Sequence, residues 1–119
     1  MNGQPDPQAF GTLDLSFFSG AYLNHVSFDI GELYLHFERP AIVIRAQQFA
    51  TLLGGELNTH PFEEAQHLRP FLNKDVTLAK WAGTHALIIT FDGGDEIHIL
   101  ESGYPESYVI DYAGQTIAV

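Results

Sequence analysis

The chain contains an internal repeat, which restricts the folds that it can adopt. Residues 18–37 align with residues 72–91 without a gap, and apolar residues occupy equivalent positions in both copies. The matched pairs include Leu33 with Leu87, Leu35 with Ile89 and Phe37 with Phe91. Self-similarity at a fixed spacing indicates a substructure that occurs twice. We therefore interpret the chain as two related halves.

Apolar and polar residues alternate within each copy. Leu33, Leu35 and Phe37 alternate with polar neighbours in the first copy, and Ile97 and Ile99 do so in the second. A period of two indicates strands with one apolar and one polar face. Gly and Asp residues between these segments are typical of tight turns. The sequence predicts two antiparallel three-strand meanders, over residues 20–28, 32–38 and 41–46 and over residues 75–82, 85–92 and 95–100.

The segment between the two copies has a helical pattern instead. Phe62, Ala65 and Leu68 recur every three residues, which predicts a short amphipathic helix over residues 61–69 that Pro70 ends or bends. A second short helix is predicted within residues 46–53, closed by the following glycines. Turn chemistry near the C-terminus predicts a final hairpin, with strands at residues 107–112 and 115–119. The expected fold class is α+β in a single domain over residues 1–119, with residues 1–10 as a flexible tail.

The charge of the chain restricts its partners. The formal net charge is −10, and residues 81–119 contain no Lys or Arg. An acidic protein repels the phosphates of nucleic acids and of anionic membranes, so neither is expected as a partner. The apolar runs are too short to cross a bilayer, and the N-terminal residues lack the pattern of a secretory signal. We therefore expect a cytoplasmic protein whose partner is basic.

The sequence lacks the patterns of the common catalytic and metal sites. It has no Cys, which excludes disulfides, thiolate zinc sites and thiol nucleophiles. None of the six His residues stands in a recognised ligand spacing with another, and the glycine pairs lack the Lys that follows in a phosphate-binding loop. We therefore expect no catalytic residues, no metal, no cofactor and no enzymatic activity.

The C-terminal third combines acidic and aromatic side chains, which are common ingredients of a protein interface with a basic partner. We expect the acidic residues and two tyrosines to lie together on a rigid surface, although tyrosines in strands often pack into the core instead. The candidate partner-binding residues are Asp92, Asp95, Glu96, Glu101, Tyr104, Glu106, Tyr108 and Asp111.

The C-terminal pattern also carries a resemblance. The segments LIITFDGGDEI (87–97), PESYVI (105–110) and GQTIAV (114–119) resemble the C-terminal half of small bacterial families linked with toxin-immunity loci. Residues 18–44 resemble the first half of the same pattern more weakly. The resemblance implies a small protein that binds a cognate toxin domain and neutralises it by occlusion. It supplies no catalytic residue.

Two other classes of function remain open from the sequence. One is a ligand-binding or enzymatic domain, whose site would form between the two meanders and the central helix. The other is a structural module that pairs an open sheet edge with a second copy of itself or with another protein.

Overall fold

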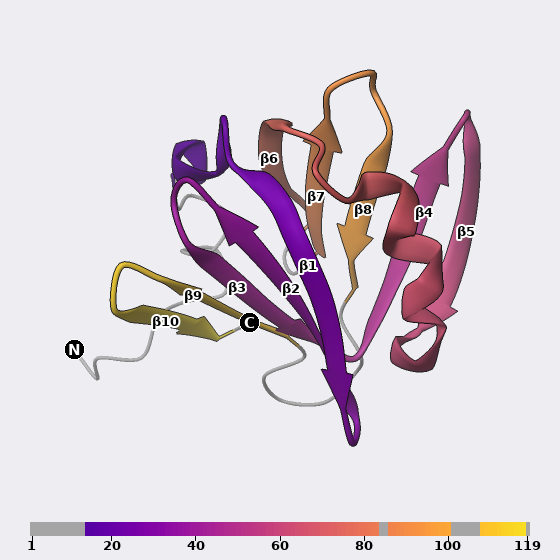
Figure 1. The fold of residues 1–119 in the computed structure, drawn as a ribbon, viewed down its shortest axis with the longest axis horizontal. Coiled ribbons are helices and arrows are strands. Elements are labelled where there is room, and N and C mark those ends of the chain that lie inside the picture. The colour runs from indigo at the N-terminus through magenta and orange to yellow at the C-terminus, as the bar shows by residue number, and fades with distance from the viewer. Residues whose placement is uncertain (1–13, 84–85, 101–107, 119) are drawn as a thin grey trace.

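The chain folds into two five-stranded antiparallel sheets with little helix. The computed structural model describes residues 14–83, 86–100 and 108–118 (Figure 1). The strand order is β1-β2-β3-β9-β10 in one sheet, called sheet A, and β5-β4-β8-β7-β6 in the other, called sheet B. The elements are η1 (Ser16–Phe18), β1 (Tyr22–Asp29), β2 (Glu32–Glu38), β3 (Ile42–Ala46), β4 (Gln48–Leu53), β5 (Glu56–Pro61), η2 (Phe62–Phe71), β6 (Val76–Ala82), β7 (Ala86–Phe91), β8 (Glu96–Ile99), β9 (Tyr108–Tyr112) and β10 (Gln115–Ala118).

Each half of the chain contributes strands to both sheets. The first half supplies β1 to β3 to sheet A and the hairpin β4–β5 to sheet B, whereas the second half supplies β6 to β8 to sheet B and the hairpin β9–β10 to sheet A. The joining pairs are β3 with β9 and β4 with β8, both antiparallel. The fold thus agrees with the α+β class only in its coarse form, because most of it is antiparallel sheet and its helical content is small. Two separate three-strand meanders are not confirmed, because a hairpin from the other half extends each predicted group to five strands.

The predicted C-terminal hairpin is present as β9 and β10. Ala113 and Gly114 connect the two strands with φ values of 55° and 77°. Positive φ at both central residues is the geometry of a type I′ turn, whose twist matches that of the flanking strands. The hairpin pairs Tyr112 with Gln115 and continues the register to Val109 with Ala118.

The helix predicted within residues 46–53 is wrong, because most of this segment forms strand β4. Phe49 and Thr51 are both buried, and the strand pairs with β5 on one side and β8 on the other. The glycines at 54 and 55 have φ values of 60° and 85°, and they form the turn into β5 rather than a helix cap. Strand β5 has no counterpart in the prediction, because its residues are mostly exposed and lack an apolar face.

The predicted central helix is present as the 3-10 helix η2. It extends to Phe71, so Pro70 lies inside the helix rather than ending it. The backbone is non-helical at Glu64, where φ is −97° and ψ is 37°, and this kink divides the segment. Leu68 and Phe71 are fully buried and anchor η2 to the core.

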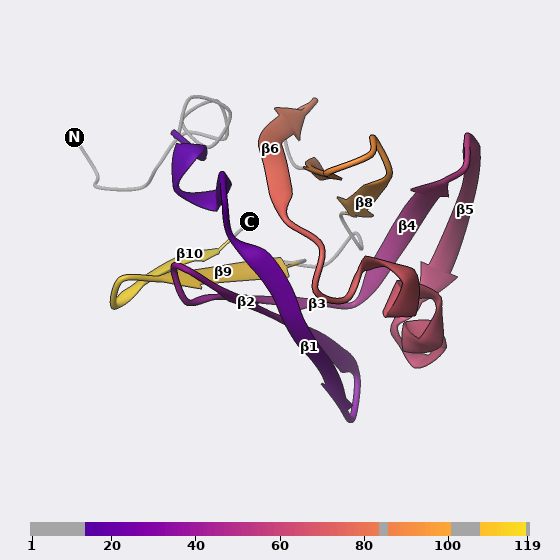
Figure 2. The same ribbon diagram turned by 45° about the horizontal axis from the view of Figure 1, so that its top comes forward.

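The core lies between the two sheets and is made by the alternating apolar residues of their strands. Leu35 and Phe37 of β2 and Ile89 and Phe91 of β7 are at most 1% exposed. Figure 2 shows sheet A nearly edge-on, with sheet B rising from it at an angle and η2 beside β5. The C-terminal half of β1, which is an edge strand of sheet A, is mostly exposed.

The two sheets are also connected through the backbone where β1 and β6 begin. Tyr22 and Asp75 form an antiparallel bridge, and the N–H of Val76 donates to the carbonyl oxygen of Ala21 at 2.7 Å. This contact joins the starts of the first strands of the two halves. In the part of the chain that the structure describes, no helix is both long enough and apolar enough to cross a membrane.

Candidate functional site

A pocket of about 370 Å³ lies between the β4–β5 hairpin and η2. The hairpin presents alternate residues to it, because side chains two apart on a strand share a face and the register pairs Thr51 with Asn58. The helix closes the other side, and η2 contacts both β4 and β5. The lining residues are Thr51, Leu53, Glu56, Asn58, His60, Gln66, His67 and Pro70. Most of them carry hydrogen-bonding groups, so the pocket suits a polar occupant.

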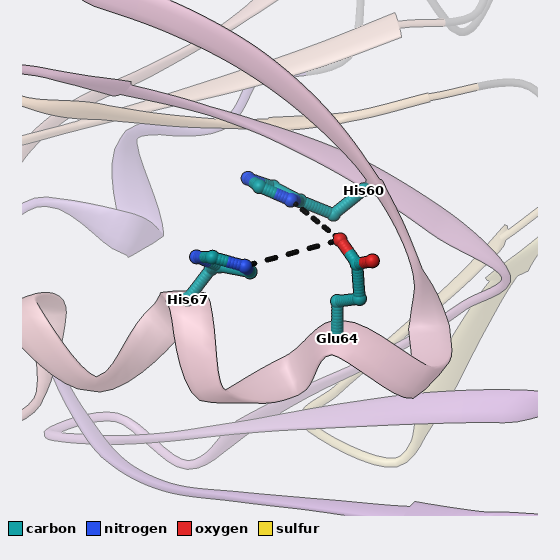
Figure 3. Close-up of side chains that lie close together, drawn as sticks. All are labelled: His60, Glu64 and His67. Atoms are coloured by element: carbon teal, nitrogen blue, oxygen red, sulfur yellow. Dashed lines mark hydrogen bonds and ion pairs between the residues drawn. The ribbon is translucent and has the colours of Figure 1, made fainter.

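Two histidines and a glutamate converge at the pocket (Figure 3). The Nδ1 atom of His60 lies 3.0 Å from Oε1 of Glu64, and Nε2 of His67 lies 3.9 Å from the same oxygen. The two imidazole rings stack, with a centroid separation of 4.1 Å and an interplanar angle of 16°. One carboxylate oxygen therefore lies near two imidazoles that come from different elements, β5 and η2.

The three side chains differ in their exposure. The side chain of His60 is 8% exposed, whereas those of Glu64 and His67 are 45% and 46% exposed. His60 packs against the ring of Phe49 at a centroid distance of 5.1 Å. The cluster thus has one buried member and two members that face solvent.

Thr51 completes the surroundings of His60. Its Oγ1 atom lies 3.3 Å from Nε2 of His60, and Thr51 itself is 4% exposed. Both ring nitrogens of His60 therefore have a partner, Glu64 for Nδ1 and Thr51 for Nε2. A buried imidazole with both nitrogens bonded is held in one orientation.

No pattern predicted from the sequence groups the three residues of the cluster. His60, Glu64 and His67 are spaced as i, i+4 and i+7, which places side chains on one face of a helix. That spacing could have predicted that the three side chains lie close together. The observed arrangement differs from a single helical face, because His60 lies on β5 and Glu64 on the kink that follows.

The predicted acidic surface is only partly assembled. Asp92, Asp95 and Glu96 lie at the β7–β8 connection of sheet B, whereas Asp111 lies on β9 of sheet A. Asp111 is bound locally, since its Oδ2 lies 3.6 Å from Nε of Arg45 and its Oδ1 accepts from Thr116 at 2.7 Å. The structure therefore does not place Asp111 with the other three. Glu101, Tyr104 and Glu106 lie outside the described residues.

Tyr108 was predicted as a partner-binding residue, and the structure contradicts this placement. Its side chain is 1% exposed and belongs to the core, because it lies at the start of β9 opposite Ala46 of β3. A buried ring of this kind contributes to the stability of the fold rather than to a surface.

The end of sheet B at the β7–β8 turn gathers acidic residues from three segments. The N–H of Asp92 donates to the carbonyl oxygen of Asp75 at 2.9 Å, and Oδ1 of Asp95 accepts from the N–H of Gly54 at 3.1 Å. Lys74 lies 3.7 Å from Oδ2 of Asp95. We call this region the acidic end; its acidic members are Glu56, Asp75, Asp92 and Asp95.

A row of side chains crosses the outer face of sheet B next to the acidic end. The register places Leu57, Leu52, Glu96, Thr90 and Leu78 side by side across all five strands. Leu57 and Leu78 are 57% and 49% exposed. In the middle of the row, Oε1 of Glu96 accepts from Nε2 of His98 at 2.8 Å. We call these five residues the outer row.

Comparison of the chain with models of protein families, with curated proteins and with solved structures gave no match.

Proposed function

We propose that the protein binds a basic partner protein and blocks it by occlusion, as an immunity protein neutralises a cognate toxin. The observation that carries the proposal is the adjacency of the acidic end and the outer row on sheet B. The first supplies charge that attracts a basic surface, and the second supplies exposed leucines. A protein interface typically combines an apolar centre with a polar rim.

The electrostatics of the acidic end favour a cationic partner. Four acidic residues belong to this end of sheet B, and Lys74 is the cation that pairs with Asp95. The formal net charge of −10 adds a long-range attraction for a basic protein. Such fields accelerate association and lose their effect when salt screens them.

The outer row supports slow dissociation. Burying the exposed surfaces of Leu57 and Leu78 against a partner removes apolar area from water, which is favourable in proportion to the area. Glu96 lies between them on a rigid strand, with its carboxylate already oriented by His98. A cationic side chain of a partner would meet a preorganised acceptor there, which reduces the ordering cost of binding.

The proposal is tested by measuring association of the chain with the purified product of the neighbouring gene. The double variant Asp75→Lys with Asp92→Lys reverses two charges of the acidic end. The matched control reverses the same number of charges at the β1–β2 turn, with Asp29→Lys and Glu32→Lys, at the other end of the molecule (Figure 1). We expect the first pair to lower the association rate constant about tenfold or more at low salt, and the control pair to change it much less.

Absence of a complex with that product, or equal effects of the two charge reversals, would contradict the proposal. If the association rate constant depends on ionic strength in the wild type but not in the double variant Asp75→Lys with Asp92→Lys, the acidic end is the source of the electrostatic attraction.

A second candidate function is a small-ligand-binding or enzymatic domain, and the polar pocket beside η2 favours it. His60, His67 and Glu64 provide the convergent titratable groups that a ligand site requires. The pocket and the outer row share no residue, because they lie on opposite faces of the β4–β5 hairpin, whereas Glu56 belongs both to the pocket lining and to the acidic end. Binding of a small ligand that Asp75→Lys and Asp92→Lys leave unchanged would distinguish this candidate from the first.

We also infer that the two halves are a duplicated substructure. Three consecutive strands followed by a hairpin occur in the same order in both halves, with each hairpin placed in the sheet of the other half. The equivalent positions Tyr22 and Val76 both begin the first strand of their half, which supports this interpretation.

A further inference from the structure

We propose that His60, Glu64 and His67 bind a divalent transition-metal ion, for which Zn²⁺ is the appropriate probe. One nitrogen of each histidine and one carboxylate oxygen of the glutamate lie within 4.8 Å of one another. Imidazole and carboxylate are ordinary ligands of Zn²⁺, with bond lengths of about 2.0–2.2 Å. The inference is independent of the proposed protein partner, because the cluster shares no residue with the acidic end or the outer row.

The positions of the three donors suit a cation. Oε1 of Glu64 already lies beside the two imidazoles, 3.0 Å from Nδ1 of His60 and 3.9 Å from Nε2 of His67 (Figure 3). Ligands of one tetrahedral Zn²⁺ ion are about 3.3 Å apart, given bonds of about 2.0 Å. The donors, which lie within 4.8 Å of one another, therefore have to move closer together around the ion, and the carboxylate oxygen has to shift outward.

The members that have to move are the exposed ones. The lone pair of an imidazole nitrogen lies in the ring plane, so His67 turns out of its stack with His60 to direct a nitrogen at the shared ion. The side chains of His67 and Glu64 are 46% and 45% exposed and have space to turn. His60 stays in place, because its side chain is only 8% exposed.

Thr51 gives His60 the second interaction that metal-binding histidines usually have. When Nδ1 of His60 binds the ion, its Nε2–H group can donate to Oγ1 of Thr51, which lies 3.3 Å away. Such a partner selects the tautomer and orients the ring. The hydroxyl also suits the metal-free protein, since it can donate as well as accept.

The pocket provides access and an open coordination position. His60 and His67 both line it, and Glu56, Asn58 and Gln66 add polar groups to the same cavity. Three protein ligands with a fourth position open to solvent are the arrangement of zinc sites that bind an exchangeable water or ligand. An ion at this cluster would thus present its free position to a polar cavity.

Metal binding would also connect two elements of the fold. His60 belongs to β5, an edge strand of sheet B, and the other two ligands belong to η2. An ion that binds only the folded arrangement stabilises it, and the effect grows with the metal concentration. The melting temperature of the chain is therefore expected to rise when Zn²⁺ is added.

The test is a Zn²⁺ titration of the chain in competition with a chromophoric chelator, accompanied by melting curves with and without Zn²⁺. His67→Ala and Glu64→Gln each remove one exposed ligand and leave the buried His60 in place. His25→Ala is the matched control, because His25 is also exposed and also stacks on a second histidine, His36, at 3.9 Å. Circular dichroism establishes that each variant is folded.

We expect one Zn²⁺ per wild-type chain, a loss of affinity of at least about tenfold in His67→Ala and in Glu64→Gln, and no change in His25→Ala. The Zn²⁺-dependent rise in melting temperature should disappear in the same two variants. The proposal is overturned if folded His67→Ala and Glu64→Gln bind Zn²⁺ as the wild type does. It is also overturned if His25→Ala weakens binding equally, or if the wild type does not bind Zn²⁺.

Discussion

Thr51 and His60 lie on the same face of the β4–β5 hairpin, with Oγ1 of Thr51 3.3 Å from Nε2 of His60. The two residues are diagonal neighbours in the register, because Thr51 pairs with Asn58 and His60 pairs with Phe49. A hairpin that the sequence analysis did not predict thus brings together the residues that orient the central histidine of the pocket.

Replacing Thr51 with Val should weaken Zn²⁺ binding. Val keeps the shape of Thr but removes the hydroxyl that orients His60, and outer partners of this kind typically change metal affinity by about 10- to 100-fold. Chelator competition measures the effect. Thr59→Val is the control, since Thr59 is exposed on the opposite face of the hairpin. Equal affinities of wild type and Thr51→Val would argue against the orienting role.

Stability should fall as the solution becomes more acidic, in part because of His36. Burial lowers the pKa of His36 below its ordinary value of 6.5, and the neighbouring charge of His25 lowers the pKa further. Below about pH 6.5 the unfolded chain therefore binds more protons at this residue than the folded chain, so stability is lost as the pH falls through that value.

Urea unfolding between about pH 7.5 and about pH 5.5 tests this prediction. His36→Gln should make the decline in stability shallower. His25→Gln should have a smaller effect through His36, because the neighbouring charge is the lesser cause of the lowered pKa. A decline in His36→Gln as steep as in the wild type would assign the pH dependence to other groups.

Leu35→Ala and Ile89→Ala should destabilise the protein by similar amounts, about 2–5 kcal/mol each. Both side chains are fully buried and lie in inner strands of their sheets, so each truncation leaves a cavity between the sheets. Chemical denaturation measures the free energy of unfolding. Leu57→Ala is the comparison, and a change below about 0.5 kcal/mol is expected there because Leu57 is exposed. If the two substitutions lower the free energy of unfolding by strongly unequal amounts, the two halves pack differently.

Asp95→Ala should lower the free energy of unfolding by about 1 kcal/mol. Its carboxylate accepts from the N–H of Gly54 at 3.1 Å and lies 3.7 Å from Nζ of Lys74, so it connects the β7–β8 and β4–β5 turns. Asp92→Ala removes an exposed carboxylate of the same end and should cost less. Thermal unfolding of the two variants at low salt compares them, and equal stability would contradict the role assigned to Asp95.

Local sequence patterns predicted much of the secondary structure. Alternation of apolar residues located β2, β3, β7 and β8, the internal repeat added β1 and β6, and turn chemistry located the hairpin β9–β10. The prediction was wrong for residues 46–53, because both faces of β4 carry buried residues and the period is obscured. Tyr108 was assigned to a surface for a related reason. The first three residues of β9 are all buried, and the sequence does not indicate that β9 lies between β3 and β10.

By itself the sequence determined which residues of β2, β3, β7 and β8 face the core, because alternation places every second side chain on the same side of a sheet. The acidic character of the chain also followed from the sequence alone. Only the tertiary structure decided that each hairpin joins the sheet of the other half, and this exchange separates Asp111 from Asp95 and forms the pocket beside η2. Pairings between distant segments depend on the packing of the whole chain, which a local pattern does not encode.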